Sequence, residues 1–571
     1  MKSDFQVEGT NQNALFTLKV HRGEGMALVA MNWRTGTPPR NFVGFAIEYK
    51  EPGGERFFAL KNRITFPAPD GEVNPNRLST RFSPIQKFRW VHFPRNAEMP
   101  GEFVYRVSPV FMDKQDVLSY GEPQEAAIEL RRETYPGKLN VTFTRGFVSS
   151  QAFVDKYVGQ GQGMETLIPP KASEGLDFVP SHPKAEEALK WMGFEARHAI
   201  LEVLDEAISD ASADVDVVAY DLSEQEVYVR LLKLANRLRI IIDDSDDHGK
   251  PTSGESIAAD RLRRAGANVK RHHMSNLQHN KTIVVSGTVC NAVVCGSTNY
   301  SWRGFFVQNN NALIARGEGP VKIFRKAFDD YLSNDSNVGF GKTASASEWH
   351  DLGIVGIDAK VTFSPHSKSN AVLSAVAKDV LEAESSLLYS LAFLAQTKGS
   401  FREAVTKVTE SEVFTYGMAD RRIGGIKIET PEGNAYPVYP AALSANLPEP
   451  FKSEPDSLSG GVGTRLHHKF VVIDFDKPTA RVYLGSYNFS NPADLANGEN
   501  LVVVRDRRVA VSYMVEALRI FDHYHFRVLQ SQKGAKKKLQ LAKPPTKTGA
   551  KAWFDDYFSL ARKIRDRELF A

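Results

Sequence analysis

Cysteine is almost absent from this sequence of 571 residues, which contains only Cys290 and Cys295. Two cysteines cannot build a disulfide framework, so a reducing compartment is favoured and both are expected to pack as small apolar side chains. No run of 18 apolar residues occurs, which argues against a transmembrane helix. The polar start of the chain also lacks the apolar stretch of a Sec signal peptide. We therefore expect a cytoplasmic protein or one that is peripheral at a membrane.

The net charge is small, at +4, with 72 Lys and Arg against 68 Asp and Glu. Residues 531–551 contain seven lysines and no acidic residue, which leaves −3 for the rest of the chain. Such a tail is most simply a flexible linker, but it could also hold an anionic membrane or nucleic acid. Aromatic and aliphatic residues from Trp553 to Ile564 predict an amphipathic helix that packs back on the body. The lysines are Lys533, Lys536, Lys537, Lys538, Lys543, Lys547 and Lys551.

The length suggests three or four domains. Residues 1–135 contain short apolar or alternating runs between turn signals, which predict a β-sandwich of the fibronectin III or immunoglobulin type. Tyr105 is a candidate for the tyrosine corner of such a module. We expect an accessory domain, because no catalytic set of residues occurs in it. The expected strands are 26–33, 42–50, 56–60, 103–112 and 126–130.

The rest of the chain alternates between helical and strand patterns, and the alternation occurs twice. It predicts a duplicated α/β fold, with mostly parallel β-sheets flanked by helices about a pseudo-two-fold axis. The expected segments are a linker at 136–183, a first half at 184–345, a second half at 346–530, and a basic linker with an amphipathic helix at 531–571. A Pro-, Ser- and Gly-rich insertion at 421–463 is expected to form a wall of a cleft.

Each half ends in the same ordered series of polar residues. The spacing from His to the first Asn is 20 residues in the first half and 21 in the second, and the last position follows 11 residues later in both. Such agreement is not expected by chance. The first series is His279, Lys281, Ser286, Ser297, Asn299 and Asn310; the second is His467, Lys469, Asp474, Ser486, Asn488 and Glu499.

Residue types and spacing together predict a site for a phosphoryl group. His and Lys two positions apart at a strand project to the same side. Two such sets, joined by Ser and Asn side chains, would surround one tetrahedral anion. One neutral imidazole can attack phosphorus while the other, protonated, gives its proton to the leaving oxygen. Since lysines and asparagines neutralise the phosphate oxygens, the chemistry requires no metal or other cofactor.

The doubled His-x-Lys motif followed by Gly-Ser-x-Asn resembles the phospholipase D superfamily, over about residues 185 to 530. The resemblance implies metal-independent phosphodiester chemistry through a phosphohistidine. It also implies catalytic roles for His279 and His467, with Ser297 and Ser486 in support. The residues that it assigns to phosphate binding are Lys281, Lys469, Asn299 and Asn488.

The sequence departs from the family pattern at two positions, Ser286 in place of Asp and Asn310 where the second half has Glu499. In the family an acidic residue at this last position supports a catalytic histidine. A carboxylate stabilises the imidazolium, whereas an amide oxygen only fixes the tautomer. We therefore predict that Glu499 supports His467 as the general acid and that His279 is the nucleophile.

The substrate stays open between two classes. Two motifs in one chain resemble phospholipases D and phospholipid synthases, which favours a phospholipid or an anionic membrane surface. The basic segment 261–271 before the first motif and the missing Asp resemble nucleic-acid phosphodiesterases, which makes DNA or RNA the alternative. That basic segment is either a solvated helix face or a rim that attracts phosphate. A third interpretation is a binding or scaffold protein with a degenerate first half.

Two further expectations complete the analysis. The acidic run 243–248 lacks a complete calcium-loop pattern, so we expect a loop rather than a metal site. A site made by two halves of one chain is also compatible with a monomer.

Overall fold

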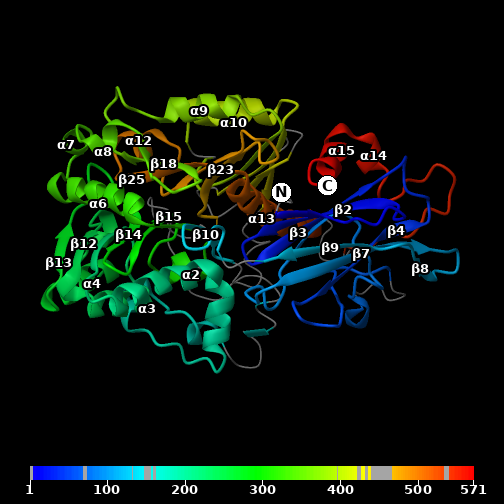
Figure 1. The fold of residues 1–571 in the computed structure, drawn as a ribbon, viewed down its shortest axis with the longest axis horizontal. Helices are drawn as coiled ribbons and strands as arrows, with labels where there is room; N and C mark the ends of the chain where they lie inside the picture. The colour runs from blue at the N-terminus through cyan, green and yellow to red at the C-terminus, as the bar shows by residue number, and fades with distance from the viewer. Residues whose placement is uncertain are drawn as a thin grey trace. The chain divides into compact units, whose positions relative to one another are not determined.

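The computed structural model describes residues 4–67, 74–130, 133–146, 153, 156–157, 163–394, 397–420, 426–430, 435–438, 466–532 and 539–571. The chain is a mixed α/β protein that divides into two compact units (Figure 1). The first, here called the discontinuous unit, comprises residues 1–132 and 511–571. The second, the central unit, comprises residues 133–510. Among the described residues, no helix is both long and apolar enough to cross a membrane.

The discontinuous unit contains two antiparallel sheets. One has the order β1-β2-β3-β6, and the other has the order β5-β4-β7-β8, with β9 also paired to β7. The strands are β1 (Gln6–Glu8), β2 (Phe16–Gly23), β3 (Met26–Trp33), β4 (Phe42–Lys50), β5 (Phe58–Ala59), β6 (Arg89–His92), β7 (Glu102–Met112), β8 (Leu118–Tyr120) and β9 (Gln124–Glu129).

Alternating apolar side chains of both sheets form one core in this unit. Phe16 of β2 and Phe45 of β4, for example, are fully buried with ring centroids 5.2 Å apart. Strands β3 and β4 have the predicted bounds, whereas β2 and β6 were not predicted. Tyr105 differs from a tyrosine corner, because its hydroxyl is hydrogen-bonded at 3.0 Å to Nδ1 of His92 and not to the backbone.

Residues 539–571 pack on the discontinuous unit, which confirms the prediction that the C-terminal segment folds back. Phe554 is 1% exposed in the common core, and Nε1 of Trp553 donates to the carbonyl of Phe42 at 3.1 Å. The segment forms two short helices, α14 (Asp556–Ser559) and α15 (Ala561–Glu568), instead of one.

The flexible-linker interpretation of residues 531–551 does not hold for the part of that tail that the structure describes. The amide of Leu541 donates to the carbonyl of Thr65 at 2.9 Å, and Lys543 forms an ion pair with Asp116 at 2.6 Å. The lysines at 533, 536, 537 and 538 lie outside the described residues.

The central unit contains two larger sheets, with the orders β10-β16-β15-β14-β11-β12-β13 and β17-β18-β25-β24-β23-β19-β20-β21-β22. The first comprises β10 (Leu139–Phe143), β11 (Asp214–Ala219), β12 (Leu238–Ile242), β13 (Asn268–Arg271), β14 (Lys281–Ser286), β15 (Asn291–Gly296) and β16 (Asn311–Arg316). The second comprises β17 (His350–Asp351), β18 (Asp358–Ser364), β19 (Ser386–Leu391), β20 (Phe414–Asp420), β21 (Ile426–Glu429), β22 (Ala435–Val438), β23 (Lys469–Ile473), β24 (Arg481–Gly485) and β25 (Glu499–Arg505).

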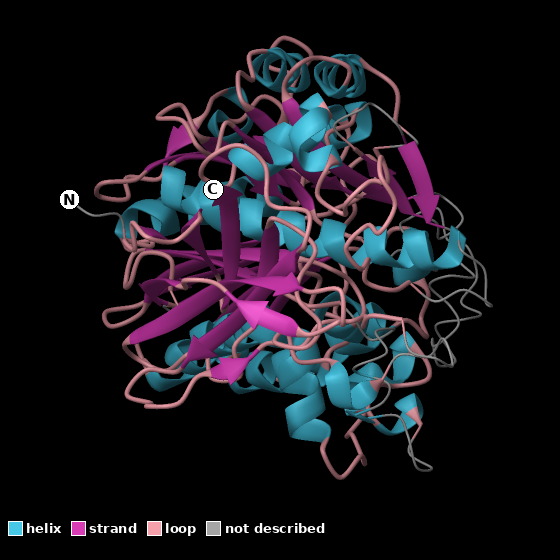
Figure 2. Ribbon diagram, turned by 90° about the vertical axis from the view of Figure 1, so that its right-hand side faces the viewer, coloured by secondary structure: helices cyan, strands magenta, loops and turns pink. Residues whose placement is uncertain are grey.

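Helices cover these sheets. On the second sheet, α9 and α10 lie side by side and share its apolar core (Figures 1 and 2). The helices are α2 (Ala185–Ser209), α3 (Gln225–Lys233), α4 (Gly254–Arg264), α5 (Trp302–Phe306), α6 (Glu318–Ser333), α7 (Asn337–Phe340), α8 (Ala344–Ser347), α9 (Leu373–Leu381), α10 (Ser400–Thr409) and α12 (Asn491–Leu495). Helix α13 (Arg507–Gln532) begins in the central unit and continues in the discontinuous unit.

The two large sheets repeat one topology, because β16-β15-β14-β11-β12 and β25-β24-β23-β19-β20 correspond strand for strand. The prediction of mostly parallel sheets is wrong. Only β11/β12, β12/β13 and β19/β20 pair in parallel among the described strands. The reason is the short loop between the two motif strands of each half, residues 287–290 and 474–480, since such a connection joins antiparallel strands.

The expected boundaries also differ from the structure. Strand β10 lies inside the expected linker 136–183 and pairs with β16, so this part of the segment belongs to the first sheet. Residues 511–530 group with the discontinuous unit and not with the second half. Of the insertion 421–463, strands β21 and β22 extend the second sheet; its other residues, apart from Thr430, lie outside the described part.

Candidate active site

The two glycines of the Gly-Ser-x-Asn motifs direct the chain out of its strand and into the site. Gly296 ends β15 with φ 144° and Gly485 ends β24 with φ 137°, both in the region that favours glycine. A Cβ atom at Gly296 would lie 2.5 Å from the carbonyl oxygen of Asn311, and one at Gly485 would lie 2.3 Å from that of Asn500. Both positions therefore require glycine.

The fold brings the two motif histidines together. His279 lies two residues before strand β14, and His467 lies two residues before strand β23. The ring centroids of the two histidines are 6.4 Å apart. They are only 3% and 4% exposed. This is the convergence that the doubled series predicts.

Backbone pairing between the halves sets this arrangement. Gln278 forms a parallel bridge with Gly498, and Leu466 forms the equivalent bridge with Asn309. The amide of Gly498 donates to the carbonyl of Leu277 at 2.8 Å. The chain that precedes each histidine therefore runs beside the last polar position of the other half.

The crossed pairing overturns the predicted partner of Glu499. Its Oε2 atom lies 2.7 Å from Nδ1 of His279, not near His467. Nδ1 of His467 instead lies 2.8 Å from Oδ1 of Asn310 and 3.2 Å from the carbonyl oxygen of Ser297. The prediction assumed that a histidine and its partner come from the same half, whereas the bridges exchange them.

Both histidines are held in the same tautomer. A carboxylate and an amide oxygen accept at the Nδ1 atoms, so Nδ1 carries the hydrogen and Nε2 keeps its lone pair. The amide of Asn310 is oriented because its Nδ2 donates to the carbonyl of Gly304 at 2.9 Å and its Oδ1 accepts from Ser297 at 2.9 Å. Two nucleophilic nitrogen atoms are thus available.

Burial keeps both imidazoles neutral at pH 7. It lowers the pKa of His279 to about 4, against the opposing effect of the Glu499 carboxylate. Burial lowers the pKa of His467 well below its usual value, and the charges of Lys469 and Lys281 lower it further. A bound anion would offset those charges and raise both pKa values.

The two motif lysines are as buried as the histidines, at 1% exposed for Lys281 and 0% for Lys469. Nζ of Lys469 donates to the carbonyl of His467 at 3.0 Å and lies 3.2 Å from Nε2 of the same residue. Nζ of Lys281 donates to the carbonyl of His279 at 2.5 Å and lies 4.6 Å from the ring centroid of Tyr220. Burial lowers the pKa of Lys281 to about 8 and that of Lys469 well below its usual value. Two desolvated ammonium groups at one place are an anion-binding arrangement.

The motif asparagines carry a second sign of a ligand site. Oδ1 of Asn299 and Oδ1 of Asn488 are buried and lack a hydrogen-bond partner among the described residues. Buried polar atoms without partners are rare, and here they occur at equivalent positions of the two halves. Since amide oxygen and nitrogen are interchangeable by a flip, each side chain can present its NH₂ group to an anion.

The motif serines brace the chain. Oγ of Ser297 donates to Oδ1 of Asn310 and Oδ1 of Asn311 at 2.9 and 2.7 Å. Oγ of Ser486 accepts from the amide of Asn500 at 3.0 Å. These contacts fix the segments that carry Asn310 and Glu499. The two serines therefore lie in supporting positions.

Asp474 lies at the opposite end of β23 from Lys469 and contacts the chain just before β19, together with the Ser385 hydroxyl at 3.1 Å and the Arg481 guanidinium at 3.9 Å. Its carboxylate accepts from the amides of Glu384, Ser385 and Ser386 at 3.0, 2.8 and 3.2 Å. In the first half, Asp210 accepts from the amides of Val289 and Cys290 at 2.9 and 3.0 Å in the turn that follows Ser286. With Ser286 in place of Asp, the first half lacks the turn contact that Asp474 makes in the second half, and the Asp210 carboxylate replaces that contact. The substitution leaves the paired histidines unchanged.

Sequence reasoning missed several residues beside the histidines. The ring of Tyr220 lies 4.7 Å from that of His279 and 4.6 Å from that of His248. Asp243 and Asp420 accept hydrogen bonds from the residues that precede the two histidines. The available signal was an Asp at the end of the second strand in each half, where ligand-contacting residues of α/β sheets gather.

One group of side chains near the first motif has the composition of a metal site. Ligand atoms of Asp221, His248 and Glu255 lie within 4.8 Å of one another. His248, however, contacts Asp221 at 3.0 Å and Asp243 at 2.9 Å. Although burial opposes it, the hydrogen bonds to the two carboxylates raise the pKa of His248 to about 11, so an imidazolium balances their charge. The acidic run forms a 3-10 turn at Asp246–Gly249, as the loop interpretation expects.

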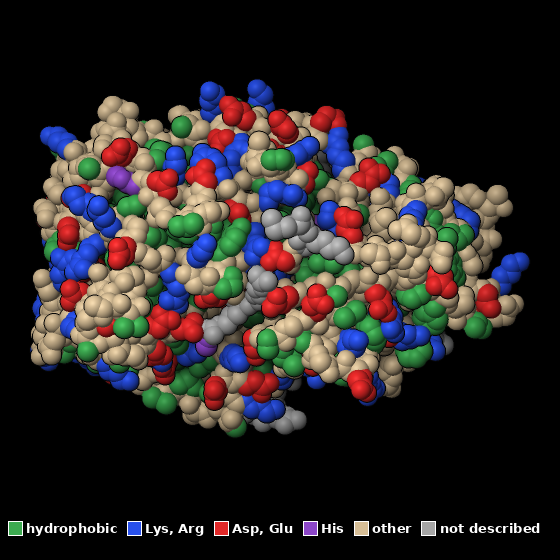
Figure 3. All heavy atoms as spheres, in the orientation of Figure 1, with side chains coloured by type: hydrophobic (Ala, Val, Ile, Leu, Met, Phe, Trp, Pro, Cys, Tyr) green, Lys and Arg blue, Asp and Glu red, His purple; other side chains and the backbone are tan. Residues whose placement is uncertain are grey.

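The basic residues before the first motif are bonded within the protein, which favours the helix-face interpretation over a phosphate rim. Arg261 pairs with Asp177 at 2.6 Å, and Arg264 pairs with Asp260 at 3.3 Å. Arg271 donates to the carbonyl of Asp243 at 2.9 Å. On the face shown in Figure 3, basic and acidic side chains are interspersed.

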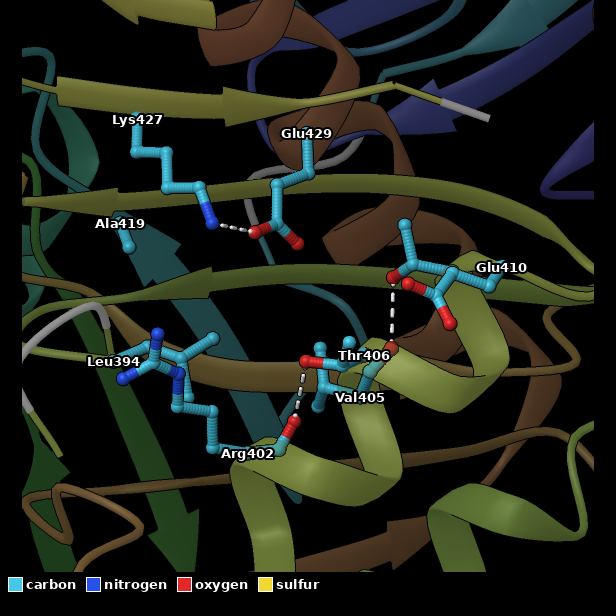
Figure 4. Close-up of a pocket in the computed structure, with 9 residues that line it drawn as sticks. Leu394, Arg402, Val405, Thr406, Glu410, Ala419, Lys427 and Glu429 are labelled. Carbon is cyan, nitrogen blue, oxygen red and sulfur yellow. Dashed lines mark hydrogen bonds and ion pairs between the residues drawn. The ribbon is translucent and has the colours of Figure 1, made fainter. Parts of the chain in front are cut away.

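A separate cavity lies between α10 and strands β20 and β21 (Figure 4). Inside it, Nζ of Lys427 lies 2.5 Å from Oε1 of Glu429. The hydroxyl of Tyr389 donates to Oε2 of the same carboxylate. No motif residue lines it. The lining residues are Leu394, Arg402, Val405, Thr406, Thr409, Glu410, Ala419, Lys427 and Glu429.

Comparison with known families gives one match. A family model described as "Cardiolipin synthase, PLD-like domain" matches residues 204–332 and 437–521, which include the first motif up to α6 and the second motif. No curated protein matches the chain.

Several solved structures are similar to the chain at low identity. Phosphatidylserine synthase of Haemophilus influenzae Rd KW20 is 12% identical, with a TM-score of 0.40 over 58% of this chain and 85% of the other. Nuc of Salmonella typhimurium, a phospholipase D family member, is 21% identical, with a TM-score of 0.21 over 24% of this chain and 87% of the other. Yeast tyrosyl-DNA phosphodiesterase is 9% identical, with a TM-score of 0.28 over 53% of this chain and 85% of the other.

Proposed function

The chain belongs to the phospholipase D superfamily, with the family match at residues 204–332 and 437–521, and from this premise we propose that it cleaves or transfers a phosphodiester through a covalent phosphohistidine. One observation carries the proposal. The two imidazoles, each with an unprotonated Nε2 and 6.4 Å apart between centroids, lie beside two buried lysines. The lysines and the Asn299 and Asn488 amides bind the phosphate oxygens, and the reaction needs no metal for that purpose.

The reaction has two steps. The Nε2 lone pair of His279 attacks phosphorus, and the electron pair of the breaking P–O bond leaves with the ester oxygen, which takes a proton from Nε2 of His467. Water or an acceptor alcohol then gives its proton to His467 and attacks phosphorus. The electron pair of the P–N bond returns to His279, and the enzyme is restored.

The partners of the histidines support these proposed roles, for a different reason than the sequence suggested. The Glu499 carboxylate makes His279 the more basic imidazole and stabilises the positive charge that its ring acquires during attack. The Asn310 amide leaves His467 less basic, so that His467 is the stronger acid once it is protonated. The charge of a bound phosphodiester offsets the lysines and allows that protonation.

We propose a phospholipid head group as the substrate. The match to a cardiolipin synthase domain supports it, and so does the internal neutralisation of the basic segment before His279. We further propose that the two antiparallel sheets of the discontinuous unit form an accessory sandwich of the fibronectin III or immunoglobulin type.

The test incubates the protein in the presence of EDTA with one of two kinds of substrate. One arm contains phosphatidylcholine or phosphatidylglycerol vesicles, and the other contains single- or double-stranded DNA. His467→Ala serves as the control in both. Head-group release that depends on His467 supports the proposal, and nicking without head-group release would assign the site to nucleic acid. No turnover in either arm would favour a binding or scaffold protein.

A second measurement tests the roles. Rapid quenching in alkaline denaturant during turnover, which preserves the acid-labile P–N bond, and mass spectrometry of the peptides should place the phosphoryl group on His279. A phosphoryl group on His467 would reverse the assignment.

A further inference from the structure

Two aspartates occupy the same place in the two halves of the central unit. Asp243 follows the last residue of β12, and Asp420 is the last residue of β20. The strand registers establish their equivalence: Ala219 pairs with Ile242 and Lys281, and Leu391 pairs with Ala419 and Lys469. Each aspartate therefore lies one residue beyond the position that aligns with a motif lysine.

Each carboxylate contacts the residue immediately before a motif histidine. Oδ2 of Asp243 accepts from the amide of Gln278 at 2.7 Å, and Oδ2 of Asp420 accepts from the amide of Leu466 at 3.2 Å. Gln278 and Leu466 are also the residues that form the bridges between the halves. The same two residues thus receive a contact from their own half and one from the other.

The charge of each carboxylate has an effect beyond the hydrogen bond. Asp243 is 0% exposed and Asp420 is 1% exposed, so both negative charges are costly to bury. An asparagine would accept from the same amide without that cost. Burial lowers the pKa of Lys281 and Lys469, and Glu499 and Asp221 oppose this shift most, with smaller contributions from Asp243 at Lys281 and from Asp420 at Lys469. Each carboxylate thus adds to the negative charge that favours the ammonium form of the lysine in its own half.

The first-half carboxylate is held by additional contacts. Oδ1 of Asp243 accepts from the amide of Ser245 at 2.9 Å and contacts Nδ1 of His248 at 2.9 Å. The ring of His248 packs on Tyr220, whose other neighbour is His279. Asp243 is therefore linked to His279 through the backbone on one side and through Tyr220 on the other.

We propose that Asp243 and Asp420 are a duplicated pair of positioning residues, each of which fixes the main chain that leads into one catalytic histidine. The inference rests on the proposed function. It predicts that the two aspartates affect different chemical events, because Asp243 acts on the nucleophile and Asp420 acts on the general acid.

The test compares Asp243→Asn and Asp420→Asn on two phosphodiesters, one with a p-nitrophenol leaving group and one with an aliphatic alcohol. A p-nitrophenolate leaves without a proton, so its release in the first step does not need His467. Because kcat/KM covers only the steps up to that release, Asp420→Asn should lower kcat/KM by about 10- to 100-fold with the aliphatic leaving group and much less with p-nitrophenol. Asp243→Asn should lower kcat/KM with both substrates, because His279 attacks phosphorus in both.

Asp494→Asn is the matched control. Asp494 is 2% exposed, contacts Nδ1 of His366 at 2.7 Å and accepts from the amide of Leu373 at 3.1 Å. The Asp494→Asn variant thus loses a buried carboxylate charge of the same kind, at a place that does not contact the chain before either motif histidine. If the variants at 243 and 420 match this control in kcat/KM with both substrates while the wild-type protein turns over, the inference is wrong and the proposed function stands.

A second readout is independent of turnover. In protein with ¹⁵N-labelled histidine, Asp243→Asn should shift the imidazole signals of His279 and not those of His467, and Asp420→Asn should do the reverse. His279→Gln and His467→Gln assign the signals. If neither aspartate variant shifts its histidine, the inference fails even in a protein without activity, where the proposed function would have failed on its own.

Discussion

Nδ1 of His279 and Oε2 of Glu499 lie 2.7 Å apart, although 220 residues of chain separate them. The contact joins the two halves of the central unit at the place where the chemistry is proposed. Each motif histidine has its Nδ1 partner in the other half, because His467 likewise contacts Asn310 of the first half. The unit of function is consequently the pair of halves.

The first prediction concerns these partners. Glu499→Gln removes the charge that supports the attacking imidazole, and kcat/KM should fall about 100-fold or more with either leaving group. Asn310→Asp adds a carboxylate to His467 and makes it a weaker acid. The loss of kcat/KM in Asn310→Asp should therefore be confined to substrates with an aliphatic leaving group. Steady-state kinetics with both substrates measure the effect, and a Glu499→Gln loss that disappears with p-nitrophenol would show that His279 is the acid.

The second prediction is a bell-shaped pH dependence of kcat/KM for the p-nitrophenyl phosphodiester, whose leaving group needs no proton from His467. His279 attacks only when neutral, so kcat/KM should rise with pH through the pKa of about 4 of His279. Lys281 binds phosphate only when charged, so kcat/KM should fall as pH rises through the pKa of about 8 of Lys281. Lys281→Arg should move the alkaline limb to higher pH, because a guanidinium keeps its proton. An alkaline limb that stays in place would assign it to another group.

The third prediction concerns the glycines that end β15 and β24. Gly296→Ala should lower the free energy of unfolding by several kcal/mol, because it combines a strained φ with a Cβ 2.5 Å from a carbonyl oxygen. Gly317→Ala is the control, since Gly317 has φ 113° and nothing within 4 Å of its Cβ position. Denaturant unfolding should show a clearly smaller loss at 317. Equal losses would mean that the backbone angle alone determines the effect.

The fourth prediction concerns the C-terminal segment. Phe554→Ala removes a buried ring from the core of the discontinuous unit and should lower its stability by about 3–5 kcal/mol. Phe58→Ala is the control, because Phe58 is 44% exposed in the same unit. Unfolding followed by tryptophan fluorescence, with Trp33 and Trp553 in that core, measures both. Similar small losses in the two variants would contradict the packing of Phe554.

Local patterns predicted much of the fold, because they depend on short-range geometry. Helix 185–209 and strand 238–242 have the bounds that their apolar spacing indicated. The doubled series predicted that His279 and His467 converge, since repeated topology brings equivalent strand ends together. The catalytic roles of these residues stay a prediction until they are measured.

Other features could not be predicted because they depend on how distant segments meet. The spacing within one half contains no information on which half supplies a histidine's partner, so the Glu499 pairing was assigned to the wrong residue. The parallel sheet was inferred from helix and strand alternation, and the short loop at 287–290 was given too little weight. Asp243 was treated as part of an acidic loop, since its contact with Gln278 spans 35 residues.

The discontinuous unit is made of the first and the last part of the chain, so it is the last of the two units to be completed during synthesis. Residues 133–510 leave the ribosome before Phe554 is made, so the central unit can fold while the first 132 residues still lack part of their core. During that interval β4 exposes Phe42, which later packs against Trp553 and Phe554. A nascent chain interrupted between 511 and 553 would therefore lack the two aromatic side chains that cover Phe42 in the finished protein.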